Sequence, residues 1–584
     1  MLRKTLTTAA FSTAAFFALS LSTGMQAAPA ASGGRGTVVE AAMRGDHEAV
    51  RTLLKSGDDV NSAQADGMTA LHWAVQKGDV ELAKLLLYGG ANVRATTRIG
   101  GYTPLLIASK NGNAQMIQTL LDGGADPKSA TSNGATALML AAVAGNADAA
   151  RLLVTRGADV NAKESVKGET ALTFAAAYGR ADVIRVLTAN GADPSVTTKV
   201  IDLEAFNKEE QERFAQFQQQ AAAANGRGGA AGAAQARGGR GFNPNAKPGI
   251  DRQYNYTELV GYWGGLAPLH IAARQGELEA VKALIEAHAN VNQRSAGDKV
   301  TPMLVATING NFDVAKYMLD HGADPTLAQE NGVTPLYAAV NCQWADKALY
   351  PQPRAQEQQH LSYLDMMKAL LDKGADPNAR LRRKVWYSQY DFDQSGIDEA
   401  GATAFWRAAY ADDIDAMKLL VKYGADVNLA TMRTPGRPRL GDDPARVVQD
   451  VSGMPPVPVG GPGVPPLLAA AGEGYGEGLA ANHHHFAAGG MLAAVKYLVE
   501  ELHVDVNARD HEGNTALHNA AARGDNEMIL YLVSKGADPK AVNRGGVTTV
   551  DMANGPVQRI SPFPDTIKLL EGMGAKNNHK CVSC

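Results

Sequence analysis

The last residues of the chain carry its most reactive side chains. Cys581 and Cys584 form a C-x-x-C pair, the spacing that serves thiol–disulfide exchange and that begins a c-type haem attachment motif. Haem attachment also requires a histidine directly after the second cysteine, where this sequence ends, and His579 precedes the pair and does not replace that ligand. The pair leaves open a terminal disulfide, two free thiols or a truncated form of a longer protein.

Two further groups of residues resemble metal sites only in part. Residues 391–396 alternate oxygen ligands before a glycine, as in the first half of a calcium loop, but Ala402 stands where that loop needs a bidentate glutamate. The three consecutive histidines at 483–485 do not converge on one tetrahedral metal without another ligand supplied by the fold. We therefore expect no metal site, no cofactor and no catalytic site.

The overall charge argues against a nucleic-acid partner. The chain has 584 residues, with 56 basic and 60 acidic side chains and a formal net charge of -4. It lacks the excess of positive charge that neutralises a phosphate backbone. Its three cysteines are too few for a disulfide framework, so the fold must be held by packing.

The elements that would position any site recur along the chain. Five turn glycines, each followed by Ala or Asp, lie 33, 34, 33 and 34 residues apart: Gly57, Gly90, Gly124, Gly157 and Gly191. Within a unit, a threonine precedes a short apolar helix, a glycine and a polar residue follow it, and a second apolar helix leads to the next turn. A period of this length indicates a stacked repeat.

The interior of the units resembles the ankyrin signature G-x-T-P-L-H-x-A-A. Gly101-Tyr102-Thr103-Pro104-Leu105 opens one unit, and Gly67-Met68-Thr69-Ala70-Leu71-His72 opens another. The resemblance implies an all-α repeat solenoid of helix-turn-helix units joined by finger loops. It also implies that His72, His270 and His518 make structural hydrogen bonds and that a protein partner binds on the concave face.

The period can be followed through the rest of the chain. The turn position recurs at His288, Gly322, Gly374, Gly424, His503, Gly536 and Gly574, which gives about twelve units. Histidine tolerates the left-handed backbone moderately, so we expect it to replace glycine at two of these turns. We assign repeats 1–5 to residues 37–200, repeats 6–8 to 265–380, repeat 9 to 401–431 and repeats 10–12 to 464–576, with a cysteine-containing tail at 577–584.

Excess residues between turns locate insertions, and we expect them to carry the function. Residues 201–264, 381–400 and 432–463 enlarge finger loops, whereas 341–360 and 472–490 enlarge the opposite edge. The first insertion starts with a polar helix over 203–224 and continues as a Gly/Ala/Arg run. We interpret that run as a flexible linker, in preference to an arginine-glycine segment that coats single-stranded nucleic acid.

The second finger insertion is rich in aromatic residues. Trp386, Tyr387, Tyr390 and Phe392 lie within it, and Trp406 follows shortly after. Aromatic side chains of this kind are candidates for the centre of a protein interface. The alternative is that they fold back over the neighbouring repeat as a satellite core.

The first thirty residues are typical of a secretory signal peptide. Arg3 and Lys4 precede an apolar run over 9–21, and small residues follow at 26–30. The run is too short to span a bilayer. The sequence therefore predicts an exported bacterial ankyrin-repeat protein, periplasmic or secreted, that acts as a non-catalytic protein-binding scaffold. The alternative is a redox or haem-linked component that uses the C-terminal cysteines.

Overall fold

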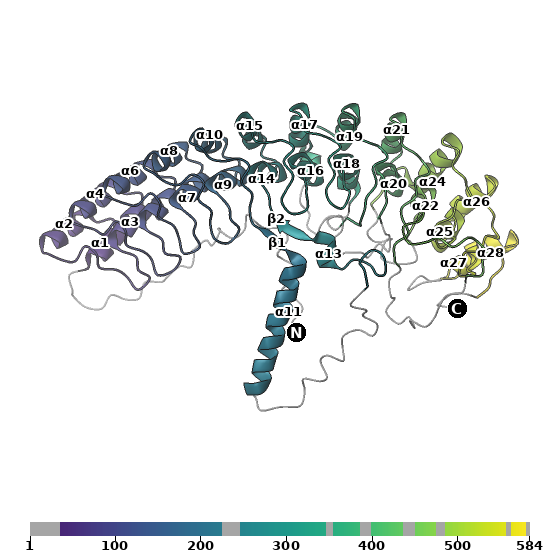
Figure 1. Cartoon of the computed structure of the whole chain (residues 1–584), viewed down its shortest axis with the longest axis horizontal. Helices are drawn as coiled ribbons and strands as arrows, with labels where there is room; N and C mark the ends of the chain where they lie inside the picture. The colour runs from purple at the N-terminus through teal and green to yellow at the C-terminus, as the bar shows by residue number, and fades with distance from the viewer. Residues whose placement is uncertain are drawn as a thin grey trace.

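The computed structural model describes residues 36–224, 246–345, 354–385, 399–435, 450–474, 485–555 and 562–579. Within these ranges the chain forms twelve pairs of antiparallel helices that stack into one curved array (Figure 1). The prediction of an all-α repeat solenoid is confirmed.

The first helix of each pair lies on the inner side of the curve (Figure 1). These inner helices are α1 (Val38–Arg44), α3 (Ala70–Gln76), α5 (Pro104–Lys110), α7 (Ala137–Ala144), α9 (Ala171–Ala177), α14 (Pro268–Gln275), α16 (Pro302–Ile308), α18 (Pro335–Trp344), α20 (Ala404–Tyr410), α22 (Pro466–Ala470), α25 (Ala516–Ala522) and α27 (Thr549–Ala553).

The second helices form the outer row. They are α2 (His47–Lys55), α4 (Val80–Tyr88), α6 (Ala114–Asp122), α8 (Ala147–Thr155), α10 (Ala181–Ala189), α15 (Leu278–Glu286), α17 (Phe312–Asp320), α19 (Tyr363–Asp372), α21 (Ile414–Lys422), α24 (Gly490–Lys496), α26 (Asn526–Ser534) and α28 (Pro564–Gly572). A π-helical turn, Tyr497–Glu501, extends α24, and a short 3-10 helix, Ala355–Gln358, precedes α19.

Capping residues set the ends of these short helices. Thr103 and Thr136 each accept a hydrogen bond from a backbone N–H in the first turn of an inner helix, and Asp79 does the same for an outer helix. The turn glycines that follow the outer helices have positive φ. His288 and His503, at φ 62° and 53°, adopt this same backbone, so the expectation that histidine replaces glycine there is confirmed.

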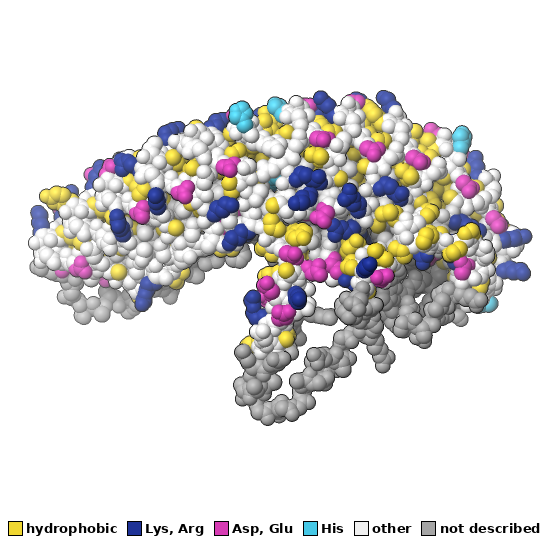
Figure 2. All heavy atoms as spheres, viewed as in Figure 1, with side chains coloured by type: hydrophobic (Ala, Val, Ile, Leu, Met, Phe, Trp, Pro, Cys, Tyr) yellow, Lys and Arg dark blue, Asp and Glu magenta, His cyan; other side chains and the backbone are white. Residues whose placement is uncertain are grey.

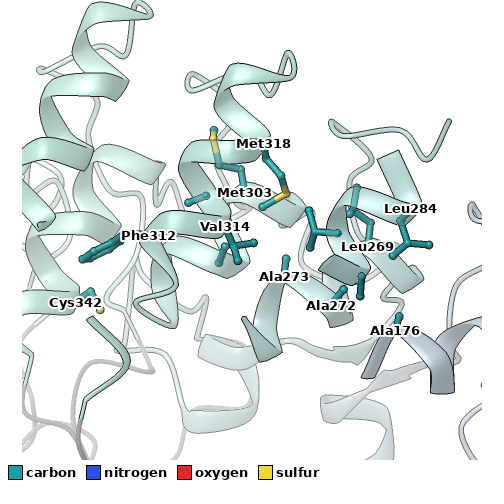
Figure 3. Close-up of a cluster of buried hydrophobic side chains, with 14 of the residues drawn as sticks. Ala176, Leu269, Ala272, Ala273, Leu284, Met303, Phe312, Val314, Met318 and Cys342 are labelled. Carbon is teal, nitrogen blue, oxygen red and sulfur yellow. The ribbon is translucent and has the colours of Figure 1, made fainter. Parts of the chain in front are cut away.

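One continuous apolar core runs along the whole stack. Leu138 and Leu172, on adjacent inner helices, are both buried in it. Figure 3 shows the part of the core where Ala176 of α9 lies near Ala272 of α14. The long insertion between these helices therefore leaves the stacking of repeats 5 and 6 intact, because each repeat needs only its two neighbours.

The described part of the first insertion forms a projecting arm. Its polar stretch is the helix α11 (Leu203–Ala224), as predicted, and the return segment contains α13 (Tyr256–Val260). Two strands that the sequence did not predict, β1 (Val200–Asp202) and β2 (Tyr262–Gly264), pair antiparallel at the root of the arm. α11 extends away from the inner side of the solenoid (Figure 1).

A second apolar cluster lies beneath repeats 7–10. Its largest side chains, Tyr337, Trp406 and Tyr410, come from α18 and α20, and Leu381 and Val385 join it from the start of the aromatic insertion. None of the helices in the described ranges is long and apolar enough to cross a bilayer.

Candidate protein-interaction surface

The finger loops are joined to one another at their tips by backbone hydrogen bonds. Arg98 N–H donates to the Asp66 carbonyl at 2.8 Å, Ser132 N–H to Gly100 at 3.0 Å and Lys199 N–H to Lys167 at 2.7 Å. The same link recurs in later repeats, where Glu330 N–H donates to Asp298 and Arg544 N–H to Glu512. The fingers thus form a connected ladder rather than separate loops.

Asparagine side chains make a second link between repeats. The Asn161 side-chain amide donates to the Gly191 carbonyl at 3.0 Å, and its oxygen accepts from Asp193 N–H at 3.0 Å. Asn507 makes the equivalent pair of bonds with Gly536 and Asp538. This role was not predicted from the sequence. Its signal is an asparagine four residues after the turn glycine, as in Gly157 and Asn161, and it is present in several units.

Six exposed basic side chains line four consecutive finger loops, and we call them the finger row: Arg94, Arg98, Lys128, Lys163, Lys167 and Lys199. Several of them donate to finger carbonyls, such as Arg98 Nη1 to the Ala65 oxygen at 2.9 Å. By contrast, basic residues on the outer helices pair with acids one turn away, for example Lys84 with Glu81 at 2.8 Å. None of the six forms an ion pair within the described ranges, although Asp193 and Glu169 lie close enough to Lys163 and Lys167 to interact with their charges.

The root of the arm is firmly attached to the solenoid. Gly265 N–H donates to the Lys199 carbonyl at 3.1 Å, and Leu203 N–H donates to Gly261 at 3.0 Å. A Cβ added at Gly264, whose φ is 81°, would lie 1.9 Å from the Lys199 oxygen, so this close approach requires glycine. Asp202 caps α11 by accepting from Glu204 N–H at 2.9 Å.

Charged contacts join the arm to the neighbouring insertion. The Arg252 guanidinium donates to both carboxylate oxygens of Glu258, at 2.7 and 2.6 Å, and holds the pKa of that carboxyl below its usual range. Arg383, at the start of the aromatic insertion, donates to the Glu258 carbonyl at 3.1 Å and lies 3.5 Å from Glu330. Two insertions that are far apart in sequence thus meet at the root of the arm.

The arm concentrates exposed apolar side chains. Half of the large hydrophobic residues that are exposed within the described ranges fall between residues 200 and 262: Val200, Ile201, Phe206, Phe214, Phe217, Ile250, Tyr256 and Tyr262. Figure 2 shows hydrophobic surface gathered where the arm leaves the solenoid. Exposed apolar surface of this extent marks an interaction site in a folded protein. The three phenylalanines of the predicted helix were the sequence signal for it.

The five residues of the predicted aromatic site have different outcomes in the structure. Trp386, Tyr387, Tyr390 and Phe392 lie outside the described residues. Trp406 does not lie on the surface, which corrects that part of the prediction: it is fully buried in the second apolar cluster, and its Nε1–H donates to the Val464 carbonyl at 2.9 Å. The satellite-core alternative therefore describes Trp406, because its large ring fills the space between α20 and the next finger.

Most of the candidate redox and metal-binding residues also lie outside the described ranges, whereas the histidine of the ankyrin signature in repeat 6 lies within them. Cys581 and Cys584, residues 391–396 and the first two histidines of 483–485 lie outside the described ranges, and these ranges contain no cluster of potential metal ligands. His270 is buried, and its Nε2 lies 3.0 Å from the Val300 carbonyl. Burial lowers the pKa of His270 to about 4, so the ring is neutral. This is the structural hydrogen bond implied by the family resemblance.

Comparison with known families agrees with this architecture. Models of ankyrin repeats match residues 38–131, 105–198 and 269–381, and further ankyrin models match 400–432 and 484–533. The chain belongs to the ankyrin-repeat family. The matched ranges leave out residues 201–264, so the family describes the scaffold of this ankyrin-repeat protein and not its arm.

Individual relatives are similar to part of the chain. Ankyrin repeat and SAM domain-containing protein 6 of Rattus norvegicus is 39% identical over 84 residues, which cover 14% of this chain and 9% of the relative. Protein phosphatase 1 regulatory subunit 27 of Mus musculus is 39% identical over 71 residues, 12% of this chain and 46% of the relative. Alpha-latrocrustotoxin-Lt1a of Latrodectus tredecimguttatus is 26% identical over 261 residues, 44% of this chain and 13% of the toxin. The matched part is thus less than half of each relative.

Proposed function

We propose that this ankyrin-repeat protein is a non-catalytic scaffold that binds another protein outside the cytoplasm. The partner occupies the concave face, where it contacts the finger row and the apolar root of the arm. The family is generally non-catalytic, and two of the three relatives described above are named as a repeat protein and a regulatory subunit.

The observation that carries the proposal is the position of the arm beside the finger row. Lys199, the last member of the row, accepts the backbone bond from Gly265 that closes the root of the arm. Positive charge and exposed aromatic side chains therefore adjoin on one rigid surface. A protein segment that combines acidic residues with apolar anchors is complementary to this surface.

Export of the chain is supported by the residues of the leader. The positive start, the apolar run over 9–21 and the small residues at 26–30 are those of a cleaved signal peptide. We expect the mature protein to begin near residue 31, and intact-mass measurement of protein recovered from the extracytoplasmic fraction tests this.

Reversal of charge on the finger row tests the binding surface. The variant combines Arg94→Glu, Lys128→Glu and Lys163→Glu, and the matched control combines Arg51→Glu, Lys84→Glu and Arg151→Glu on the outer helices. All six residues are exposed, and the three residues of each set lie in three different repeats. Both triple variants change the net charge by the same amount, so bulk charge cannot explain a difference between them.

The readout is the set of proteins captured from the extracytoplasmic fraction by immobilised chain. We expect the wild type and the outer-helix control to capture the same partner, more strongly at low salt, and the finger variant to lose it. Equal capture by the finger variant and the wild type would show that the partner does not use this surface.

A further inference from the structure

The arm helix α11 carries a stripe of three apolar and two charged residues with the spacing of a paired helix. Leu203, Phe206, Glu210, Arg213 and Phe217 follow one another at intervals of three, four, three and four residues, which places them on one face. Phe206 and Phe217 are 49% and 67% exposed, and Phe214, beside the stripe, is 63% exposed. Such exposure is unusual for three phenylalanines on one helix.

This stripe is not covered by the solenoid. Leu203 is buried at the root of the arm, whereas the described side chains that follow it up to Phe217 are exposed, apart from the half-buried Glu210. Figure 1 shows α11 projecting away from the helix stack. A projecting helix gains little stability in water from its backbone alone and usually depends on packing of its apolar face.

The two charged residues within the stripe indicate what packs there. Glu210 and Arg213 form an ion pair at 2.8 Å within the helix. Residues 210 and 213 are symmetric about a midpoint between 211 and 212, and residues 206 and 217 are symmetric about the same midpoint. We infer that α11 pairs antiparallel with α11 of a second copy of this chain, with Phe206 against Phe217 and Glu210 against Arg213 of the other helix.

Charge selects this arrangement over the parallel one. In a parallel pair in register, Glu210 would face Glu210 and Arg213 would face Arg213, and like charges in facing positions are unfavourable. The antiparallel pair instead alternates an aromatic layer, two layers of opposite charge and a second aromatic layer. A self-complementary sequence of layers is what a twofold interface requires, because each residue meets its partner twice.

The attachment of the arm permits this pairing. α11 leaves its solenoid at Leu203, so an antiparallel pair carries one solenoid at each end. The stripe from residue 206 to 217 is about 16 Å long at the rise of an α-helix. The stripe does not include any residue of the finger row, and the short contact predicts a weak dimer whose population depends on protein concentration.

Charge reversal with complementation tests the pairing on the full chain. Sedimentation equilibrium over a micromolar concentration series should show a monomer–dimer equilibrium for the wild type. Arg213→Glu should be monomeric because it places Glu210 against a second acid, and Glu210→Arg should be monomeric because it opposes two bases. An equimolar mixture of the two variants should recover the dimer, because each acidic helix then meets a basic one.

The mixture separates the intermolecular contact from helix stability. Mixing restores no intrahelical ion pair, so recovery of the dimer can come only from contact between copies. Lys208→Glu is the matched control, since Lys208 is an exposed charge off the stripe, and it should dimerise like the wild type. The double variant Phe206→Ser and Phe217→Ser should be monomeric.

Three results would overturn the inference: a wild type that is monomeric throughout the series, a mixture that stays monomeric, or a dimer that survives the serine substitutions. The proposed scaffold function is judged separately by capture of a partner through the finger row. A monomeric chain that still captures its partner through that row would remove the dimer and leave the scaffold in place.

Discussion

Repeats 1–5 and repeats 7–10 differ in the side chains that their inner helices pack against the next finger loop. In the regular first part, the residue three positions after the capping threonine is never tyrosine or tryptophan. It is polar in His72 and Thr173 and aliphatic in Leu106 and Met139. In repeats 8 and 9 the same position holds Tyr337 and Trp406, which belong to the second apolar cluster.

A histidine in the first part and a tryptophan in repeat 9 make the same hydrogen bond from this position. His72 Nε2 lies 3.1 Å from the Tyr102 carbonyl, directly before the next capping threonine. Trp406 Nε1–H donates at 2.9 Å to the Val464 carbonyl, at the equivalent place before α22. Enlarged fingers leave room for a large ring, and the indole satisfies the carbonyl that histidine satisfies elsewhere.

The largest expected effect tests the core that both parts share. Leu138→Asn should lower the free energy of unfolding by about 4 kcal/mol or more, because it removes apolar contacts and buries an amide without partners. Leu172→Asn should behave alike. Urea denaturation measures both, with Leu530→Asn as the control at an exposed position. Unchanged midpoints would place these leucines outside the core.

A tryptophan in each part tests the second cluster. Trp406→Ala should lower the free energy of unfolding by about 3 to 5 kcal/mol, since the ring is fully buried. Trp73→Ala, at a partly buried position of α3, should cost about 1 kcal/mol. Equal denaturation midpoints for the two variants would show that Trp406 contributes no more to stability than Trp73.

The turn between the helices of repeat 9 should make stability depend on pH. In the first part this turn holds a glycine such as Gly78, but repeat 9 has Asp412 at φ 55°, buried and without a hydrogen-bond partner for its carboxylate among the described residues. Burial raises the pKa of Asp412 to about 8, although the charge of Arg523 opposes the shift.

The sign follows from linkage. The folded state binds a proton at Asp412 more tightly than the unfolded state does. The stability that comes from this proton is therefore complete below the unfolded pKa of about 4 and is lost as the pH rises towards 8. Relative to Asp412→Asn, the wild type should lose on the order of 4 kcal/mol between pH 5 and 8.5. Denaturation at both pH values measures this, with Asp415→Asn as the exposed control.

The buried histidines also make stability depend on pH, but they do not affect the difference between the wild type and Asp412→Asn. The pKa values of His270 and His518 are lowered to about 4 by burial, so these residues destabilise the fold as the pH falls below about 6.5. They are present in the wild type and in the variant alike. Parallel pH profiles for wild type and Asp412→Asn would show that Asp412 is not the group responsible.

The smallest expected effect concerns the left-handed turn. His288→Gly should raise the free energy of unfolding by about 0.5 kcal/mol, because relief of the φ 62° backbone slightly exceeds the entropy that glycine adds to the unfolded chain. Gly322→His, at the same position one repeat later and with φ 92°, should have the opposite sign. Thermal denaturation compares the two, and shifts of the same sign would contradict this account.

The arm shows where local sequence patterns suffice and where they fail. Helix α11 begins at Leu203 and ends at Ala224, as its polar composition predicts. The β1–β2 pair was missed because the segments it joins are separated by about sixty residues and each strand has only three. The prediction that Trp406 is exposed was wrong because it rested on the nearby aromatic insertion. The residues that bury Trp406 come from other parts of the chain.

The length of the repeat, the number of units and the positions of the turns can be read from the sequence alone, because they depend on contacts within a unit or between adjacent units. Spacing, capping threonines and left-handed glycines are local properties, and the stack follows from their repetition. The folded structure was needed to show that the first insertion projects as an arm (Figure 1), that Arg383 joins a second insertion to its root, and that Trp406 belongs to the core. Those outcomes depend on contacts between residues far apart in the chain, such as Arg383 and Glu258, and periodicity contains no information about them.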